Sequence, residues 1–273
     1  MKREDFINIK RVVVKVGTST LSYKNGRLNF QRMGLLAKTL SALRKMGLQV
    51  VLVSSGAIGV GAGRLNLTKK PSTLAFKQAL AALGQAQLMK IYQKLFDNYN
   101  QWVAQVLLTK DVMTIPERYK NARGTLFKLF EMGIIPIINE NDTIATDEIE
   151  FGDNDTLSAM VSNLVNADLL ILLSDIDGFY SADPKTDKEA KIIRSVTSIS
   201  PELEKIASGS GSSFGTGGMS TKITAAKIAS EHGIDTILAL GDQPSIVLDI
   251  INGKEIGTHF IADKIKQNSI YHE

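Results

Sequence analysis

Short apolar runs alternate with helical patterns along most of the chain, and this alternation is the feature that most constrains the fold. The first apolar run covers residues 9–16 and breaks at Gly17. A repeat at helical spacing follows, formed by Met33, Leu36, Leu40 and Leu43. It stops at Gly47, as a helix does at a C-terminal cap, and a second apolar run begins at once over residues 48–53. This is the order of a βαβ unit, in which helices join parallel strands.

The same alternation continues to near the end of the chain. Further strands are predicted at residues 103–108, 134–138, 169–173 and 236–240. Further helices are predicted at 74–96 and 117–132, from Asn154 onward, and from the segment 215–222. Several of these strands are apolar throughout, so both faces of their sheet must be covered. We therefore expect an α/β fold, a three-layer sandwich with a central, mostly parallel sheet, in a single domain spanning residues 1–273.

Composition narrows the classes of function. The chain has no cysteine, which excludes disulfides, thiolate zinc sites and cysteine nucleophiles, and its three histidines lie far apart. Its 273 residues, 44% of them hydrophobic, supply a sizeable core without cross-links. No run approaches the roughly 18 apolar residues of a membrane span, and the N-terminus lacks a signal-peptide pattern. We expect a cytoplasmic protein with no membrane partner.

The charge pattern does not indicate a nucleic-acid surface. The net charge is +4, from 32 lysines and arginines against 28 aspartates and glutamates. The basic residues are spread along the chain and interleaved with the acids, and they form no cluster with aromatic residues. We interpret this balance as a solvated surface and expect no nucleic-acid partner.

Loops rich in glycine follow the first two predicted strands. Lys15 precedes the turn at Gly17, where backbone amides can approach a phosphate, although a solvated lysine is the alternative. Ser-Ser-Gly-Ala at residues 54–57 opens a glycine-rich loop that extends to Gly63 and serves either anion binding or close packing. Neither this loop nor a later glycine-rich segment fits Gly-x-Gly-x-x-Gly, and the chain has no P-loop motif. Nicotinamide dehydrogenases and P-loop kinases are therefore disfavoured.

An acidic and amide-rich region follows the strand predicted at 134–138. It comprises Asn-Glu-Asn-Asp at 139–142 and Gly-Asp-Asn-Asp at 152–155, with further acids between them. Capping of a helix explains one member of the second group but not the whole region. Aspartate and asparagine side chains suit an ammonium group of a substrate and, through water, Mg²⁺. We assign no direct magnesium ligand.

Two later segments complete the set. Ser-Asp-Ile-Asp-Gly-Phe-Tyr at 174–180 follows an apolar strand and is typical of a strand-end turn. The second segment is Ser-Phe-Gly-Thr-Gly-Gly-Met-Ser-Thr-Lys at 213–222, in which small residues precede the start of a predicted helix. The backbone amides, the hydroxyl groups and Lys222 at this helix start favour binding of an anion. This segment predicts phosphate binding. The stretch 207–218, rich in glycine and serine, is predicted to be a mobile loop.

Six segments, in this order, resemble the amino-acid kinase family, and the resemblance covers nearly the whole chain. They are Lys-Val-Gly-Thr-Ser at 15–19, Ser-Ser-Gly-Ala-Ile at 54–58, Asn-Glu-Asn-Asp at 139–142, Gly-Asp-Asn-Asp at 152–155, Ser-Asp-Ile-Asp-Gly-Phe-Tyr at 174–180 and Gly-Thr-Gly-Gly-Met-Ser-Thr-Lys at 215–222. The resemblance implies the fold of this family, with an N-terminal lobe over residues 1–165 for the acceptor and a C-terminal lobe over 166–273 for ATP. Many members also carry a C-terminal PUA domain, and we expect none here because the stretch after residue 253 is short.

Within the family, the segments are most similar to members that phosphorylate the side-chain carboxylate of L-glutamate, the first step of proline synthesis. The substrate-binding residues that this implies are Ser55, Gly56, Asn139, Asp142 and Asn154. The implied ATP-binding residues are Lys15, Ser174, Asp175, Thr216, Gly217, Gly218, Met219, Ser220, Thr221 and Lys222. By the same resemblance, Lys15 and Lys222 flank the transferred phosphoryl group, and Asp153 is a third catalytic residue that orients both lysines.

The resemblance also implies ATP and Mg²⁺ as cofactors, a homo-oligomer, proline as a feedback inhibitor, and a glutamyl phosphate reductase as a partner. Physical chemistry agrees at one point. A glutamate side chain has a reference pKa of about 4.3, so the nucleophile is already ionised at neutral pH and needs no general base. Acetylglutamate and aspartate kinases share the nucleotide half of the site and remain alternatives, as does a nucleotide-binding sensor without catalysis.

Overall fold

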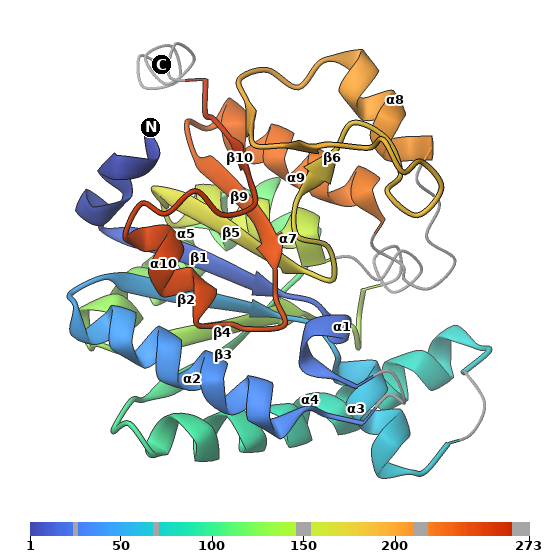
Figure 1. Ribbon diagram of the computed structural model, residues 1–273. Coiled ribbons are helices and arrows are strands. Elements are labelled where there is room, and N and C mark those ends of the chain that lie inside the picture. The colour runs from blue at the N-terminus through green and yellow to red at the C-terminus, as the bar shows by residue number, and fades with distance from the viewer. Residues whose placement is uncertain (24–26, 68–70, 146–153, 210–217, 264–273) are drawn as a thin grey trace.

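A mostly parallel β-sheet forms the middle layer of the protein (Figure 1). The computed structural model describes residues 1–23, 27–67, 71–145, 154–209 and 218–263. Within these ranges the sheet has eight strands in the order β3-β4-β2-β1-β5-β9-β10-β8. The pairing of β10 with β9 is antiparallel, and the other pairings within this sheet are parallel. The predicted α/β class and the mostly parallel sheet are confirmed.

The bounds of the strands and helices follow from the backbone. The large sheet contains β1 (Arg11–Val16), β2 (Gln49–Ser54), β3 (Val103–Leu108), β4 (Ile135–Glu140), β5 (Leu169–Ser174), β8 (Ser195–Val196), β9 (Asp235–Leu240) and β10 (Thr258–Phe260). A small hairpin pairs β6 (Phe179–Tyr180) with β7 (Ile192–Ile193). The α-helices are α1 (Thr18–Leu21), α2 (Phe30–Lys45), α3 (Ala57–Arg64), α4 (Leu74–Asp97), α5 (Pro116–Glu131), α7 (Asn154–Leu164), α8 (Pro201–Gly209), α9 (Met219–Glu231) and α10 (Ile246–Ile251). Two 3₁₀ helices are η1 (Arg3–Asn8) and η2 (Lys110–Met113).

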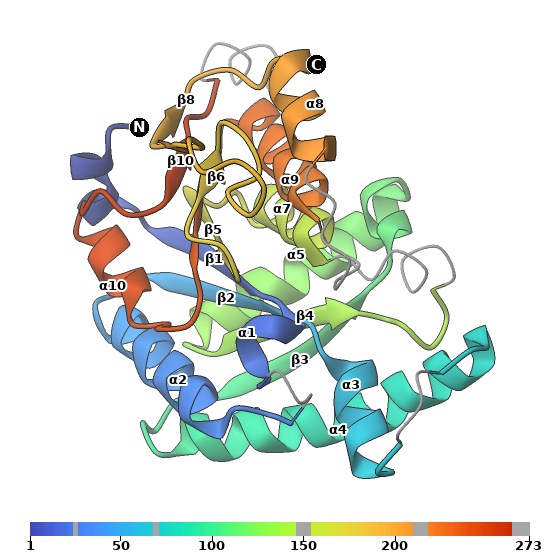
Figure 2. The same ribbon diagram turned by 45° about the vertical axis from the view of Figure 1, so that its right-hand side comes forward.

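The sheet and the helices on its two faces form three layers, with one apolar core on each face of the sheet. Side chains alternate between the faces along a strand. Val12 and Val14 of β1 therefore lie in the core formed with α2, α4 and α10, whereas Val13 lies in the core formed with α5, α7 and α9. Both views of the ribbon show these two groups of helices on opposite faces (Figures 1 and 2). Every residue of β5 is buried, which accounts for its apolar sequence. Full burial of one large apolar side chain stabilises the folded protein by about 1.5–3 kcal/mol.

The strand order reverses direction at β1, which places a ligand site there. The chain adds β2, β4 and β3 on one side of β1 and then crosses to add β5 and β9 on the other side. In an open parallel sheet, ligands bind outside the carboxyl ends of the strands at such a switch point. Lys15 near the end of β1 lies opposite Val53 of β2 and Leu172 of β5. The loops after β1, β2, β4 and β5 therefore share one end of the molecule.

Most predicted elements are confirmed, with ends that shift by one or two residues, but two predicted loops are wrong in part. The glycine-rich segment after Ser55 is a helix, α3, from Ala57 to Arg64. The stretch predicted as a mobile loop from residue 207 begins inside α8, which continues to Gly209. Residues 210–217 lie outside the described residues.

Close packing between α3 and α4 explains Gly61, which belongs to the predicted loop, and Gly84 in α4. A Cβ added at Gly84 would lie 1.8 Å from the carbonyl oxygen of Ala57, and one added at Gly61 would lie 2.1 Å from the carbonyl oxygen of Leu80. These two glycines therefore let the helix backbones touch. Gly56, which precedes α3, has a φ of 104°, a conformation that glycine adopts without strain.

Candidate active site

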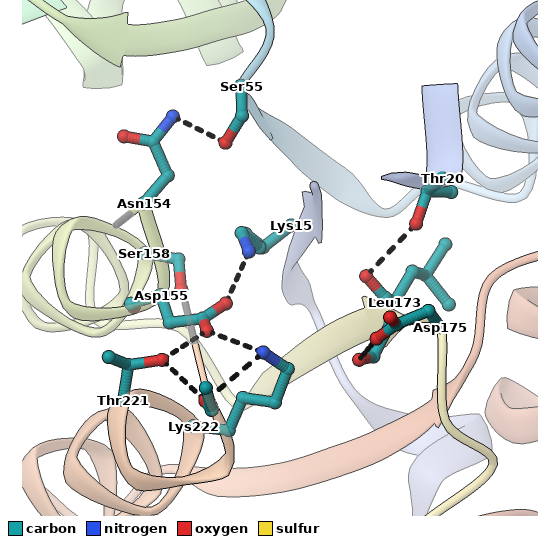
Figure 3. A network of polar contacts seen from close by, with 12 residues as sticks. Lys15, Thr20, Ser55, Asn154, Asp155, Ser158, Leu173, Asp175, Thr221 and Lys222 are labelled. Atoms are coloured by element: carbon teal, nitrogen blue, oxygen red, sulfur yellow. Dashed lines mark hydrogen bonds and ion pairs between the residues drawn. The ribbon is translucent and has the colours of Figure 1, made fainter. Parts of the chain in front are cut away.

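Three buried charged side chains meet at the carboxyl end of β1. The carboxylate of Asp155 forms an ion pair with Lys15 through Oδ1 and with Lys222 through Oδ2, the latter at 3.1 Å. Thr221 donates a hydroxyl hydrogen bond of 3.0 Å to the same Oδ2 atom. Figure 3 shows both lysine ammonium groups pointing at this carboxylate. We call Lys15, Asp155 and Lys222 the charged cluster.

Three elements position the charged cluster. Lys15 is the next-to-last residue of β1, Asp155 is the second residue of α7, and Lys222 lies in the first turn of α9. The two helices pack against each other on the same face of the sheet. Gly218 caps α9, and its carbonyl oxygen lies 2.8 Å from Thr221 Oγ1, so it shares the single hydroxyl hydrogen of Thr221 with Asp155. The first turns of α7 and α9 therefore converge on Lys15, and the backbone amides of a helix start favour an anion.

The electrostatics of the charged cluster suit a phosphate. Two ammonium groups and one carboxylate give a formal charge of +1 in side chains that are no more than 8% exposed. Burial by itself raises the pKa of Asp155, but the adjacent Lys15 and Lys222 outweigh burial and hold that pKa well below its usual range. Asp155 is therefore ionised at neutral pH and is not suited to accept a proton as a general base. Its remaining role is to hold two cations in place.

A second group of polar side chains lies beside the charged cluster. The Asn154 side-chain nitrogen lies 2.9 Å from Ser55 Oγ, 3.1 Å from the Ser54 carbonyl oxygen and 2.7 Å from Asn139 Oδ1, so its two hydrogens are shared among three acceptors. Asn139 in turn donates to Gln85 Oε1 of α4 at 2.9 Å. We call Ser55, Asn139 and Asn154 the amide cluster. Asn154 and Asp155 are neighbours in the chain, so the amide cluster and the charged cluster are joined at the start of α7.

The structure brings together three of the five predicted substrate-binding residues through direct hydrogen bonds. These are the members of the amide cluster. Gly56 adjoins Ser55 and begins α3. Asp142 lies half-buried in the turn after β4.

The predicted ATP-binding residues fall into two groups. Gly218, Met219, Ser220, Thr221 and Lys222 form the start of α9. Ser174 ends β5, is buried, and donates a hydrogen bond of 3.1 Å to the exposed Asp175. Figure 3 places Asp175 on the β5 side of the site. Thr216 and Gly217 lie outside the described residues.

The residue that bridges the two lysines was not among the predicted site residues. The resemblance gave this role to Asp153, which lies outside the described residues, whereas the bridging carboxylate in the structure belongs to Asp155. A signal for Asp155 exists in the sequence, because Asp155, Ser158 and Ser162 recur at helical spacing and form a buried polar stripe on α7. Both serine hydroxyls are satisfied by carbonyl oxygens one turn earlier, at 2.5 and 2.7 Å. The Asp155 carboxylate is thus the member of the stripe whose partners come from other elements.

Two further observations concern metals and membranes. In the parts of the chain that the structure describes, no three acidic or histidine side chains are grouped so that they could hold a metal ion. Over the same ranges, no helix combines the length and the apolar character needed to cross a membrane.

Comparison with known proteins agrees with this geometry. The sequence profile of the amino acid kinase family matches residues 10–239. The chain belongs to the amino acid kinase family. It is 57% identical over 259 residues to a glutamate 5-kinase from Clostridium perfringens, covering 93% of this chain and 96% of that protein. It is 51% identical over 266 residues to a glutamate 5-kinase from Listeria monocytogenes, covering 96% of both chains.

A solved structure shares the fold of this amino acid kinase. A carbamate kinase from Giardia lamblia bound to AMP-PNP superposes with a TM-score of 0.67 at 16% identity, covering 94% of this chain and 100% of that one. At this identity the likeness concerns the fold alone. It confirms the expected amino-acid kinase fold, with its three-layer sandwich around a central sheet.

Proposed function

We propose that the protein acts as a glutamate 5-kinase, which transfers the γ-phosphoryl group of ATP to the side-chain carboxylate of L-glutamate and yields L-glutamyl 5-phosphate, the first step of proline biosynthesis. The observation that carries this proposal is the buried charged cluster joined to the amide cluster at the start of α7. The identity of 57% to a glutamate 5-kinase over most of both chains supports the choice of substrate.

The chemistry of this reaction fits a site without a general base. The glutamate carboxylate is ionised at neutral pH, because its reference pKa is about 4.3. One of its oxygens attacks the γ-phosphorus, a P–O bond forms, and the bond from the γ-phosphorus to the β–γ bridging oxygen breaks, leaving ADP. No proton has to be removed from the nucleophile. The protein contributes positioning and neutralisation of charge, which is usual for phosphoryl transfer.

Lys15 and Lys222 supply the neutralising charge, and Asp155 fixes their positions. Each ammonium group is held by a carboxylate oxygen, so both cations are oriented before the nucleotide binds. Donors held in place in a buried site stabilise developing charge at little reorganisation cost. The start of α9, from Gly218 to Lys222, adds backbone amides and hydroxyls for the phosphates. Ser174 and Asp175, with Thr216 and Gly217, complete the ATP-binding set by resemblance.

Mg²⁺ accompanies ATP in this proposal. The ion needs few protein ligands, because it keeps several waters and binds mainly to substrate phosphates, where it offsets their charge. Asp155 is engaged by two lysines and is therefore not assigned as a magnesium ligand. The described residues offer phosphate partners for a nucleotide, and the two acids of the 139–142 segment lie at the same end of the sheet, Glu140 as the last residue of β4 and Asp142 in the turn after it.

The amide cluster binds glutamate in this proposal. Figure 3 shows the Asn154 amide nitrogen turned toward Ser55 and its oxygen turned away, so the oxygen can accept a hydrogen bond from the substrate ammonium group. Asp142 adds negative charge for the same ammonium group, and the amide of Gly56 adds a donor for a carboxylate. The acceptor is thus bound mainly by the N-terminal lobe of residues 1–165, and the nucleotide mainly by residues 166–273.

An assay with several acceptors tests the proposed function. ATP consumption is measured with glutamate, aspartate, acetylglutamate and UMP, and hydroxylamine is added to trap any acyl phosphate as a hydroxamate. Hydroxamate that forms with glutamate and is absent with the other acceptors is the expected result. Formation with aspartate or acetylglutamate in its place would assign the chain to another specificity, and no nucleotide turnover with any acceptor would indicate a non-catalytic sensor.

Regulation and location follow from the same proposal. We place the enzyme in the cytoplasm as a homo-oligomer that supplies an acyl phosphate to a glutamyl phosphate reductase. Proline inhibits it at or near the glutamate site. Inhibition that added glutamate relieves, measured in the hydroxamate assay, is the expected result, whereas inhibition that glutamate leaves unchanged would contradict a shared site.

A further inference from the structure

The hydrogen bonds around Asn139 form a chain whose direction is fixed at one end. The Ser54 carbonyl oxygen only accepts hydrogen bonds, and it lies 3.1 Å from the Asn154 side-chain nitrogen. Asn154 must therefore present its NH₂ group on this side. The Asn139 side-chain atom that lies 2.7 Å from the Asn154 nitrogen must then be its oxygen Oδ1. The Asn139 nitrogen is therefore the atom that faces Gln85. Gln85 must in turn present its oxygen to Asn139.

This direction leaves the buried NH₂ group of Gln85 without a partner among the residues that the structure describes. Gln85 is 7% exposed, and within the described residues its Nε2 atom makes no hydrogen bond. A buried donor left without a partner destabilises a folded protein. Turning the Gln85 amide over would place two NH₂ groups against each other, so the unpaired donor is a consequence of the polarity that the chain requires. Gln85 is thus poorly placed for stability and well placed to orient Asn139.

The packing of α4 holds Gln85 at this point. Gly84 lets the helix backbone approach α3, since a Cβ there would lie 1.8 Å from the Ala57 carbonyl oxygen. Tyr92, two turns further along the same buried face of α4, forms a 2.8 Å hydrogen bond with Ser54 Oγ. One helix therefore contacts the ends of both β2 and β4 through polar side chains.

We propose that Gln85 is a positioning residue for the acceptor substrate. It accepts from Asn139, holds that side chain in the orientation that the Ser54 carbonyl oxygen requires, and so keeps the Asn154 oxygen available for the substrate ammonium group. Gln85 acts through Asn139 and Asn154, because its own amide is buried beneath them. The inference rests on the proposed glutamate kinase activity and adds to it a residue from α4 that determines how well the acceptor binds.

Two substitutions separate positioning from packing. Gln85→Leu keeps the approximate volume but removes the acceptor, so Asn139 loses its anchor. Gln85→Glu keeps an acceptor oxygen for Asn139 whether its carboxyl group is ionised or protonated. We expect Gln85→Leu to raise the glutamate KM about tenfold with little change in the ATP KM or in kcat, as loss of one hydrogen bond in the binding site does. Gln85→Glu should restore a glutamate KM within about threefold of the wild-type value.

Gln101 provides a matched control. It is also a buried glutamine, and its amide donates to the carbonyl oxygens of Trp102 and Gly133, both at 2.9 Å, away from the site. Gln101→Leu removes both bonds, so its melting temperature should fall by several degrees while its glutamate KM stays unchanged. The melting temperature of Gln85→Leu should change less, because that substitution also removes an unpaired buried donor.

The wild-type enzyme is assayed first, by hydroxamate formation with glutamate. A wild type that forms none overturns the proposed function together with this inference. An active wild type beside a Gln85→Leu variant with an unchanged glutamate KM overturns the inference alone. Equal increases of KM in Gln85→Leu and Gln85→Glu would also overturn it, because an acceptor at this position would then have no effect.

Discussion

Replacing Asp155 by asparagine tests the charged cluster most fully. The amide keeps the shape of the side chain and removes the negative charge that holds Lys15 and Lys222. Two buried ammonium groups would then face each other with no carboxylate between them. Leaving a buried charge without its partner costs about 3–5 kcal/mol, a large part of the usual 5–15 kcal/mol of total stability. We expect Asp155→Asn to lose about this much at pH 7, with turnover reduced at least about a hundredfold because the lysines move.

The pH dependence of this loss has a definite sign. The pKa of Asp155 is lowered in the folded protein relative to an unfolded aspartate near 3.9. A group whose folded pKa is depressed contributes stability that is complete above its unfolded pKa and is lost as the pH falls toward the folded pKa. The difference in unfolding free energy between wild type and Asp155→Asn should therefore be constant above about pH 5 and shrink below about pH 4.

Urea unfolding at a series of pH values measures this difference, with Asp235→Asn as the control. Asp235 is also a fully buried aspartate with two nitrogen partners, the N-terminal ammonium group at 2.9 Å and His259 Nε2 at 2.6 Å, but it lies at the amino end of β9. Asp235→Asn should lose stability and keep its turnover. An Asp155→Asn protein as stable as wild type, or a difference that grows as the pH falls, would refute the reasoning.

Three further predictions concern single side chains. Gly84→Ala should destabilise the protein by about 1–3 kcal/mol or more in urea unfolding, because its Cβ would lie 1.8 Å from a backbone oxygen of α3. Gly63→Ala should leave the stability unchanged, because no atom lies within 4 Å of its added Cβ. Lys222→Ala should lower kcat about a hundredfold or more, because a cation that neutralises the phosphoryl group is lost. Lys227→Ala is the control, since it loses only a surface ion pair on the same helix and should keep wild-type kinetics. Equal kinetics in the two variants would contradict the role of Lys222. Asp142→Ala should raise the glutamate KM about tenfold at unchanged kcat, and an unchanged KM would remove Asp142 from the substrate site.

The sequence predicts the sheet better than it predicts the contacts between helices. Apolar strands such as Leu169–Ser174 carry their own signal, because burial on both faces demands an uninterrupted apolar run. The signal that a glycine carries is ambiguous, because glycine occurs both in loops and where two backbones pack closely. Gly61 is required where two helix backbones touch, and nothing in the local sequence distinguishes that role from a flexible loop. For this reason the sequence predicts a loop where the structure has the helix α3.

The site shows the same division. Lys15, Asn154 and Lys222 could be proposed from short segments, because each follows a strand or starts a helix. Asp155 carried a weaker signal, the helical spacing it shares with Ser158 and Ser162, and that spacing does not tell which face of α7 packs against Lys15. Gln85 carried no local signal at all, because its partner Asn139 is 54 residues away in the chain and the two meet only when α4 packs beside β4.

The fate of the carboxylate oxygens of glutamate tests the central claim most directly. Glutamate labelled with ¹⁸O in its side-chain carboxylate is incubated with ATP, Mg²⁺ and hydroxylamine, and the inorganic phosphate released is analysed by mass spectrometry. If a carboxylate oxygen attacks the γ-phosphorus, hydroxylamine then displaces phosphate from the acyl carbon and that oxygen leaves with the phosphorus. The account predicts one ¹⁸O atom in each phosphate. Phosphate without ¹⁸O would mean that water, and not glutamate, accepts the phosphoryl group.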